Sequence, residues 1–292
     1  MREIVFTDLD GTLLDPFTYS YKQAASAIAL LQQRGIPLIF CSAKTRAEQE
    51  LYRQELRISD PFIVENGGAI FIPKDYFPFP FDYHKAAGGY LVIELGIPYQ
   101  EIRSILKRVE EQSRLGIRGF GDMSAEEVAD VSGLDVASAR RAKEREYDET
   151  LRLEGSKEDV QRILHLIEDK GLNWAHGGKY YDVMGGNDKG KATSILVELF
   201  TRKLGRLKTI AIGDSLNDLP MLSVVDVPVL VQKPGGCWEN IDLPGLYRVE
   251  GVGPQGWKTA IGEVLAVSSR LVHYPMSEER KDSNNYPSNK YP

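Results

Sequence analysis

The segment IVFTDLDGTLLD, at residues 4–15, restricts the fold of this chain more than any other stretch. Its apolar residues 4–6 do not alternate with polar ones, which is typical of a parallel strand buried on both faces. Asp8 and Asp10 follow this strand, and Gly11 turns the chain away. Ligands of parallel sheets bind beyond the carboxyl ends of the strands, so both carboxylates stand where chemistry is expected.

Two carboxylates that point into one pocket repel each other unless a cation lies between them or one of them is protonated. Asp8 and Asp10 therefore predict a metal site, an acid/base pair, or both. The alternative is that these residues and Gly11 only form the turn that ends a strand. The order DLDGT is more specific than a turn requires, and this favours the chemical interpretation.

Length, charge and cysteine content limit the class of protein. With 292 residues the chain can form one large domain or two smaller ones, and its net charge of −6 gives no sign of nucleic-acid binding. No apolar run approaches the roughly 20 residues that span a bilayer, and the chain starts in a strand without a leader. Cys41 and Cys237 lie far apart and form no ligand cluster. We expect a cytoplasmic protein with a small-molecule partner, as a monomer or a homodimer, and no nucleic-acid or membrane partner.

The order of apolar strands and amphipathic helices predicts an α/β fold with a doubly wound, Rossmann-like parallel sheet. A run of Pro, Phe and Tyr at 73–83 marks the exit into a second unit, and residues 84–188 have strands and helices of their own, including a charged helix at 135–146. The predicted domains are a core at 1–83 and 189–272, an inserted α/β domain at 84–188, and a polar tail at 273–292.

Polar residues follow other predicted strands as well. Ser42 comes after the strand at 36–40, where it either holds a phosphate oxygen or caps the next helix. Lys189 precedes a helix, and the strand at 208–212 leads into Asp214, Asn217 and Asp218. These groups would converge with Asp8 and Asp10 in one crevice. Hard oxygen ligands suit Mg²⁺, and a lysine offsets phosphate charge, so the set predicts Mg²⁺-dependent phosphoryl transfer.

The four motifs DLDGT, Ser42, Lys189 and GDSLND resemble those of the haloacid dehalogenase superfamily, in the same order. The insert resembles the α/β cap of the Cof-type sugar phosphatases. Further segments look like signatures of the mannosyl-3-phosphoglycerate phosphatases: ENGGAIFIP, RGFGDMSAEEVADVSGL, RAKEREYDE, GGNDKGKA and GPQGWKTAI. The segment REYDET lacks a proline expected after the acidic residue, and Tyr181-Asp182 and the tail also depart from the pattern.

The resemblance implies a mechanism through an aspartyl-phosphate. Asp8 would attack phosphorus, and Asp10 would protonate the leaving alkoxide and later deprotonate water. Ser42 and Lys189 would bind the phosphoryl oxygens; Lys191 is the alternative lysine, although helical spacing turns it away. The Mg²⁺ ligands would be the Asp8 carboxylate, the Asp10 main-chain carbonyl and Asp214, supported by Asn217 and Asp218.

The resemblance also implies the reaction, hydrolysis of mannosyl-3-phosphoglycerate, or of its glucosyl counterpart, to the glycosylglycerate and phosphate. Such a substrate brings a glycerate carboxylate and sugar hydroxyls, which need cations and hydrogen-bond donors. The candidates for these contacts are Lys44, Arg46, Asn66, Arg118, Arg141 and Lys143. For the arginines of a charged helix the alternative is simple solvation, and for Asn66 it is a tight turn. His84 and His176 are interpreted as structural.

Three alternatives remain open from the sequence. They are a broader sugar phosphatase, a phosphomannomutase-like phosphotransferase, and a sugar-phosphate sensor on an enzyme scaffold. The intact Asp8, Asp10, Lys189 and Asp214 argue against the sensor, because a sensor needs no nucleophile.

Overall fold

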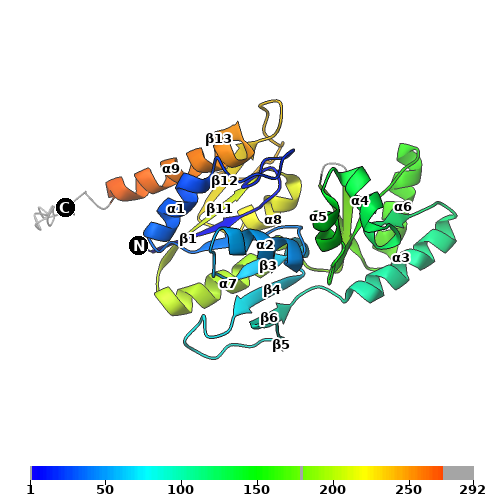
Figure 1. Cartoon of the computed structure of the whole chain (residues 1–292), viewed down its shortest axis with the longest axis horizontal. Helices are drawn as coiled ribbons and strands as arrows, with labels where there is room; N and C mark the ends of the chain where they lie inside the picture. Colours follow the sequence, from blue (N-terminus) through cyan, green and yellow to red (C-terminus); the bar gives the residue numbers. More distant parts are fainter. Residues whose placement is uncertain (1, 178–179, 272–292) are drawn as a thin grey trace, which may run out of the picture.

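A parallel five-stranded sheet forms the centre of the protein, seen in a computed structural model that describes residues 2–177 and 180–271 (Figure 1). The strand order is β13-β12-β11-β1-β2. The strands are β1 (Arg2–Thr7), β2 (Leu38–Phe40), β11 (Leu207–Gly213), β12 (Val227–Gln232) and β13 (Tyr247–Val252). In the register of β1, Val5 lies between Ile210 and Leu38, and all four pairings are parallel. The carboxyl ends of β1 and β11 therefore meet at the same edge.

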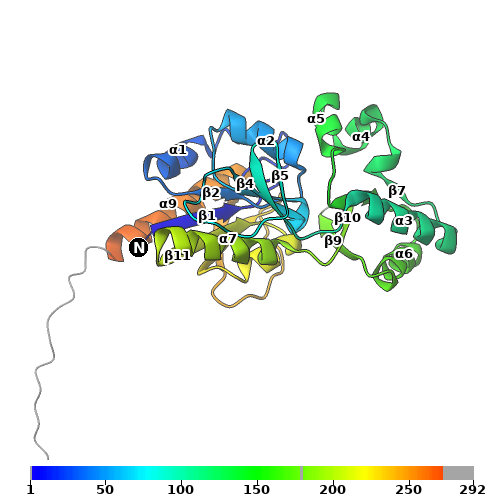
Figure 2. The same ribbon diagram turned by 90° about the horizontal axis from the view of Figure 1, so that it is seen from below.

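Helices cover both faces of this sheet, which confirms the predicted α/β class (Figure 2). Val5 points to the face covered by α1 (Ala25–Gln33) and α9 (Gly253–Leu271). Ile4 and Phe6 point to the opposite face, which α7 (Lys189–Leu204) and the short α8 (Leu219–Leu222) cover. This two-sided burial explains why β1 lacks an apolar–polar alternation.

A second, antiparallel sheet has the order β3-β4-β6-β5 and continues from the core. Its strands are β3 (Phe62–Val64), β4 (Ala69–Pro73), β5 (Lys85–Ala87) and β6 (Tyr90–Glu94), with η1 (Glu65–Gly67) between β3 and β4. A bridge from Cys41 to Ile63 joins it to the central sheet. Within the aromatic run, Tyr76 and Phe77 pack against Phe200 of α7. The predicted domain boundary after residue 83 stays a prediction; because β5 and β6 extend this sheet, we propose a boundary after β6.

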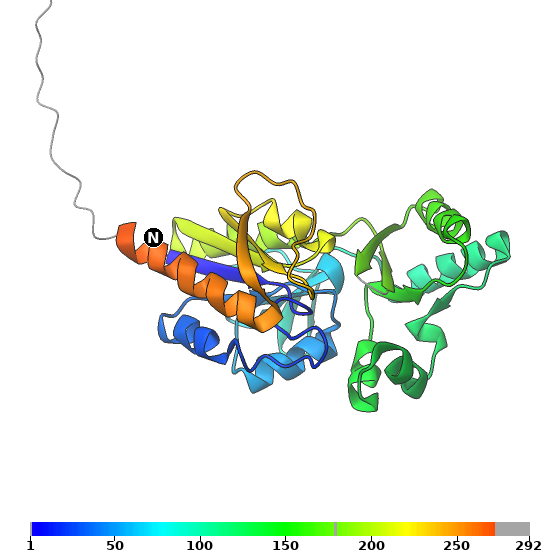
Figure 3. The ribbon, with the colours of Figure 1, turned by 90° about the horizontal axis from the view of Figure 1, so that it is seen from above.

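The third sheet, antiparallel with the order β7-β8-β10-β9, lies in the insert. Its strands are β7 (Arg118–Gly119), β8 (Asp148–Arg152), β9 (Asn173–Gly177) and β10 (Tyr180–Met184). The helices α3 (Tyr99–Ser113) and α6 (Lys157–Asp169) share an apolar cluster with this sheet, whereas α4 (Ala125–Ser132) and α5 (Val136–Ala142) pack around Phe120 of η2 (Phe120–Asp122). Figure 3 shows the insert beside the core.

The core and the insert meet both through secondary-structure elements and through side chains at their junction. Helix α5 contacts α2 (Arg46–Glu55) of the core, as Figure 2 also shows, and β9 contacts η3 (Leu216–Asp218). The predicted helix at 135–146 ends at Ala142. The reason is that the amides of Glu146, Tyr147 and Asp148 donate to the Glu65 carboxylate of the core instead of to helical carbonyls.

No helix in residues 2–177 or 180–271 is long and apolar enough to cross a membrane. Both cysteines are free, Cys41 buried and Cys237 exposed. The predicted polar tail at 273–292 lies outside the described residues.

Candidate active site

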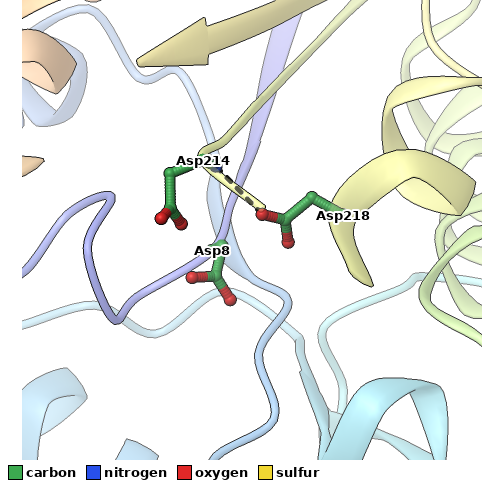
Figure 4. Close-up of side chains that lie close together, drawn as sticks. All are labelled: Asp8, Asp214 and Asp218. Carbon is green, nitrogen blue, oxygen red and sulfur yellow. Dashed lines mark hydrogen bonds between the residues drawn. The ribbon is translucent and has the colours of Figure 1, made fainter. Parts of the chain in front are cut away.

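Three buried carboxylates converge at the carboxyl ends of β1 and β11 (Figure 4). Asp8 follows β1, Asp214 follows β11, and Asp218 ends η3. One oxygen of each carboxylate lies within 4.8 Å of the others. The structure thus brings together the two strand-end motifs that the sequence analysis placed at one crevice.

Glycines allow the loops around these carboxylates to approach closely. Gly11 has a φ of +76°, and a Cβ added there would lie 2.8 Å from Asp214 Oδ2. A Cβ at Gly213 would lie 2.5 Å from Asp218 Oδ2. Any larger residue at either position would displace a site carboxylate, so the glycines of DLDGT and GDSLND have a steric role in addition to turn formation.

Hydrogen bonds fix the orientation of two of the three carboxylates. Asp214 accepts a hydrogen bond on each oxygen, at 3.0 Å from the Thr12 hydroxyl and at 3.0 Å from the Ser215 hydroxyl. Asp218 Oδ2 accepts from the backbone amides of Asp214 and Ser215, at 3.0 and 3.1 Å. Both oxygens of Asp218 are engaged, because Oδ1 accepts from Lys189. Asp218 is thus held through both of its oxygens.

Lys189 supplies the positive charge at the centre of the site. Its Nζ lies 2.7 Å from Asp8 Oδ1 and 2.6 Å from Asp218 Oδ1, and the side chain is fully buried. Lys191, the alternative lysine, is exposed, and its ammonium contacts Gly186 O and Asp188 instead. Of these two lysines, only Lys189 faces the carboxylates.

The site carries more negative than positive charge. Burial raises the pKa of Asp8 well above its ordinary value; Lys189 opposes this shift, and the carboxylates of Asp218 and Asp214 add to it. Burial and Asp218 raise the pKa of Asp214 to about 7. A divalent cation would relieve this crowding, and an all-oxygen donor set suits Mg²⁺. The residues present therefore fit the predicted metal, with Asp8 and Asp214 as the carboxylates best placed to hold it.

Asp10 lies at the mouth of the site, with 46% of its side chain exposed. Its carboxylate makes a 3.0 Å ion pair with Lys44, which also contacts Glu48 at 3.1 Å. Desolvation in the crevice raises the pKa of Asp10, and Lys44 opposes that shift. A carboxyl group that retains its proton more readily than usual is suited to protonate a leaving group.

Beside Asp10 and Lys44 there is a cavity of about 410 Å³ between the core and the insert. The core contributes Tyr19, Lys44 and Tyr52, and the insert contributes Ser138 and Arg141. The cavity is lined by the cations of Lys22, Lys44 and Arg141, by the carboxylates of Glu48, Glu55 and Asp135, and by hydroxyl groups and aromatic rings. The cations suit an anionic group of a ligand, and the hydroxyl groups and rings suit a sugar.

Ser42 is buried directly after β2, and its hydroxyl accepts from the Lys44 amide at 3.3 Å. The N-cap of α2 is Thr45, which forms a capping box with Glu48. Capping by Ser42, the alternative left open by the sequence, is therefore not what the structure has. The role of Ser42 in phosphate binding stays a prediction.

The remaining candidates for substrate contact are engaged elsewhere. Arg46 pairs with Glu50 and Glu146, the exposed Arg118 pairs with Glu127, and Lys143 donates to Met123 O. Asn66 is buried and hydrogen-bonded to both core and insert. Of the six candidates for substrate contact, Lys44 and Arg141 line the cavity next to Asp10 and the other four do not.

The sequence analysis missed a buried polar network at the junction of core and insert, formed by Glu65, Arg145, Asp148, Thr150 and Asp182. It also missed the chain from Trp257 Nε1 to the Thr7 hydroxyl, at 3.0 Å, and on to the carbonyl of Asp8, at 2.7 Å. Signals were present only as charged residues inside the motifs ENGG and REYDE and as a lone tryptophan in GPQGW.

A larger cavity of about 650 Å³ lies at the opposite edge of the central sheet and contains none of these residues. Its cations include Arg34, Arg57 and Lys203, which stand at or just beyond the C-terminal ends of α1, α2 and α7. Cations at these positions offset the negative ends of helix dipoles, so a ligand is not needed to explain them.

Comparisons with known proteins agree with this arrangement. A family model described as haloacid dehalogenase-like hydrolase matches residues 5–113 and 131–233. A glucosyl-3-phosphoglycerate/mannosyl-3-phosphoglycerate phosphatase from Methanococcoides burtonii is 48% identical over 93% of this chain and 100% of its own. A mannosyl-3-phosphoglycerate phosphatase from Pyrococcus horikoshii is 42% identical over 79% of this chain and 91% of its own. The crystal structure of Thermoplasma acidophilum 0175 has the same fold, with a TM-score of 0.65 at 18% identity, covering 90% of this chain and 98% of that one.

Proposed function

The chain belongs to the haloacid dehalogenase-like hydrolases and is a phosphatase of that family, and we propose that its substrate is a glycosyl-3-phosphoglycerate with mannose or glucose as the sugar. The products are the glycosylglycerate and inorganic phosphate. The observation that carries the proposal is the buried contact of Lys189 with Asp8, beside a cavity that Lys44 and Arg141 line.

In the first half of the proposed reaction, Asp8 attacks phosphorus and the bond from phosphorus to the glycerate oxygen breaks. The departing alkoxide takes the proton of Asp10. Lys189 and Ser42 hold the phosphoryl oxygens, so Lys189 exchanges part of its contact with Asp8 for contact with the substrate. The result is an aspartyl-phosphate on Asp8 and the free glycosylglycerate.

In the second half, a water molecule attacks the aspartyl-phosphate, and Asp10 takes the proton of this water. Phosphate leaves, and both aspartates return to their starting protonation states. The Asp8 carboxylate, the Asp10 carbonyl and Asp214 would hold Mg²⁺, with Asn217 and Asp218 in support. When bound, the ion offsets the charge of the carboxylates and of the phosphoryl group.

Lys44 and Arg141 are the proposed contacts of the glycerate carboxylate, because both line the cavity next to Asp10. The tyrosines of the same cavity, Tyr19, Tyr21 and Tyr52, present rings and hydroxyl groups suited to a sugar. Arg46, Arg118 and Lys143 do not line this cavity, which makes them weaker candidates for direct contact.

A phosphate-release assay tests the proposal. It compares mannosyl- and glucosyl-3-phosphoglycerate with hexose phosphates and sucrose phosphate at saturating Mg²⁺. We expect turnover of one or both glycosyl phosphoglycerates to exceed that of the other substrates, and Asp8→Asn to abolish it. Equal rates on all substrates would leave a broad sugar phosphatase. Isomerisation of a hexose phosphate without phosphate release would point to a phosphotransferase, and binding without turnover to a sensor.

A further inference from the structure

Asn66 lies at the centre of a buried hydrogen-bonded link between the insert and the loop that carries Asp214 and Asn217. Its Nδ2 donates to Asp182 Oδ2 at 3.2 Å and to Asp148 Oδ2 at 3.4 Å, both in the insert. Its Oδ1 accepts from Asn217 Nδ2 at 3.4 Å. We propose that Asn66 is a positioning residue that couples the placement of the insert to the metal-holding loop. This inference rests on the proposed function, because it assigns Asp214 and Asn217 to a Mg²⁺ site.

The chemistry of the amide explains why asparagine stands at this position. The two sides of the link require opposite groups: donors toward the carboxylates of Asp148 and Asp182, and an acceptor toward the amide of Asn217. Only a side-chain amide offers both at one short position. The side chain is 3% exposed, so loss of these partners would leave buried polar atoms without hydrogen bonds.

The backbone at Asn66 is held in an uncommon conformation. Glu65 and Asn66 have φ values of 48° and 54°, in the left-handed region that asparagine tolerates better than most residues. The next residue, Gly67, lies very close to the segment that connects β10 to α7, and a Cβ on Gly67 would lie 2.1 Å from Asp188 O. Such strain persists where the surroundings fix it, and it places the amide of Asn66 between core and insert.

Glu65 holds the insert in the position in which Asp148 and Asp182 contact Asn66. Its carboxylate accepts from the backbone amides of Glu146, Tyr147 and Asp148, at 3.0, 2.6 and 2.9 Å. These amides lead directly into β8, whose first residue, Asp148, contacts Asn66. Because β9 of the insert also contacts η3, the insert meets the metal-holding loop both directly and through Asn66. An insert that moved away from the core would take the partners of Asn66 Nδ2 with it.

The consequence is that Asn217 is fixed only when the insert is in place. Asn217 lies between Asp214 and Asp218 in sequence, so its orientation affects both carboxylates of the loop. Changes in groups that orient metal ligands typically alter metal affinity about 10–100-fold. Coupling through Asn66 thus ties metal binding to the arrangement that encloses the substrate.

The test measures Mg²⁺ binding by calorimetry on the substrate-free protein, together with kcat and KM at saturating Mg²⁺. Asn66→Gly keeps the left-handed backbone and removes the amide, and Asn66→Asp keeps the size and puts a third carboxylate against Asp148 and Asp182. We expect both variants to bind Mg²⁺ about tenfold more weakly or worse and to lower kcat. The matched control is Tyr180→Phe, which removes a 2.7 Å hydrogen bond to Val131 O inside the insert and involves neither the core nor a partner of Asn66; it should change Mg²⁺ affinity less than about twofold.

A double-mutant cycle with Asn217→Ala separates positioning from general damage. If Asn66 acts through Asn217, the double variant Asn66→Gly/Asn217→Ala binds Mg²⁺ no more weakly than Asn217→Ala alone. The proposal is overturned if folded Asn66→Gly and Asn66→Asp bind Mg²⁺ like the wild type, if Tyr180→Phe weakens binding as much, or if the two losses in the double-mutant cycle add. The calorimetry needs no substrate, so its outcome is independent of the proposed glycosyl phosphoglycerate, which the phosphate-release assay tests by itself.

Discussion

Lys189 Nζ lies 2.7 Å from Asp8 Oδ1, and both residues are almost fully buried. The ammonium group holds the carboxylate at the end of β1 and also contacts Asp218. Removal of one partner from such a pair leaves a buried charge without compensation, which costs more than the pair itself contributes. We therefore expect this contact to contribute to both stability and catalysis.

Substitution Lys189→Met should lower both activity and stability. We expect kcat to fall by at least about 100-fold, because a group that stabilises the transition-state charge is lost. In the absence of Mg²⁺ the free energy of unfolding should drop by about 3–5 kcal/mol, measured by urea denaturation. Lys191→Met is the matched control, since Lys191 is exposed and should tolerate the change. Equal effects of the two substitutions would contradict the assignment of the buried lysine.

Asp10→Asn should leave the fold intact and lower kcat by about 10²–10⁴-fold, the contribution of general acid–base catalysis. The loss should be smaller for formation of the aspartyl-phosphate from 4-nitrophenyl phosphate, because nitrophenolate leaves without a proton. Rapid-mixing measurements with both substrates separate the two steps. An equally large loss of the first step with both substrates would mean that Asp10 does not protonate the leaving group.

The residues at the carboxyl edge of the central sheet were predictable because short sequence motifs specify them. The uniform apolar run of β1 predicts burial on both faces, and residues that follow parallel strands must meet at one edge. Asp8, Asp214 and Asp218 meet there, and Lys189 joins them at the first residue of α7.

The junction with the insert was not predictable in the same way. Glu65, Asp148 and Asp182 are charged residues that a sequence pattern assigns to the surface, and their burial depends on partners some 80 to 120 positions away. The predicted helix at 135–146 ended early for the same reason, since Glu65 captures the amides that would have continued it. Tertiary contacts of this kind override local helix propensity.

In the metal-free protein, Asp214→Asn should increase stability at pH 8 while it abolishes Mg²⁺-dependent activity. Burial and Asp218 raise the pKa of Asp214 to about 7. Between about pH 4 and pH 7 the unfolded chain has released this proton while the folded protein still holds it. The free energy of unfolding of the wild type therefore falls as the pH rises through this range. The variant has no such proton to lose. Thermal unfolding in EDTA should show its advantage at pH 8 and little difference at pH 4. A variant less stable than the wild type at pH 8 would contradict this view of the crowded site.

Arg141→Met should weaken binding of the glycosyl phosphoglycerate without harming the chemistry of small substrates. The guanidinium lines the cavity beside Asp10. Among the described residues, its side chain donates a hydrogen bond only to the Ser138 hydroxyl, at 3.0 Å, so it is available to a carboxylate. Loss of one charge-assisted hydrogen bond of about 1.5–3 kcal/mol predicts a KM raised roughly tenfold or more. The KM for 4-nitrophenyl phosphate, which has no glycerate, should not change. The neighbouring Arg140 is 69% exposed, lies 3.8 Å from Glu126 and does not line the cavity. Arg140→Met is therefore the matched control and should behave like the wild type. A rise in KM for both substrates, or from both substitutions, would argue against a contact of Arg141 with the glycerate carboxylate. Lys44 would then be the remaining proposed contact of this carboxylate.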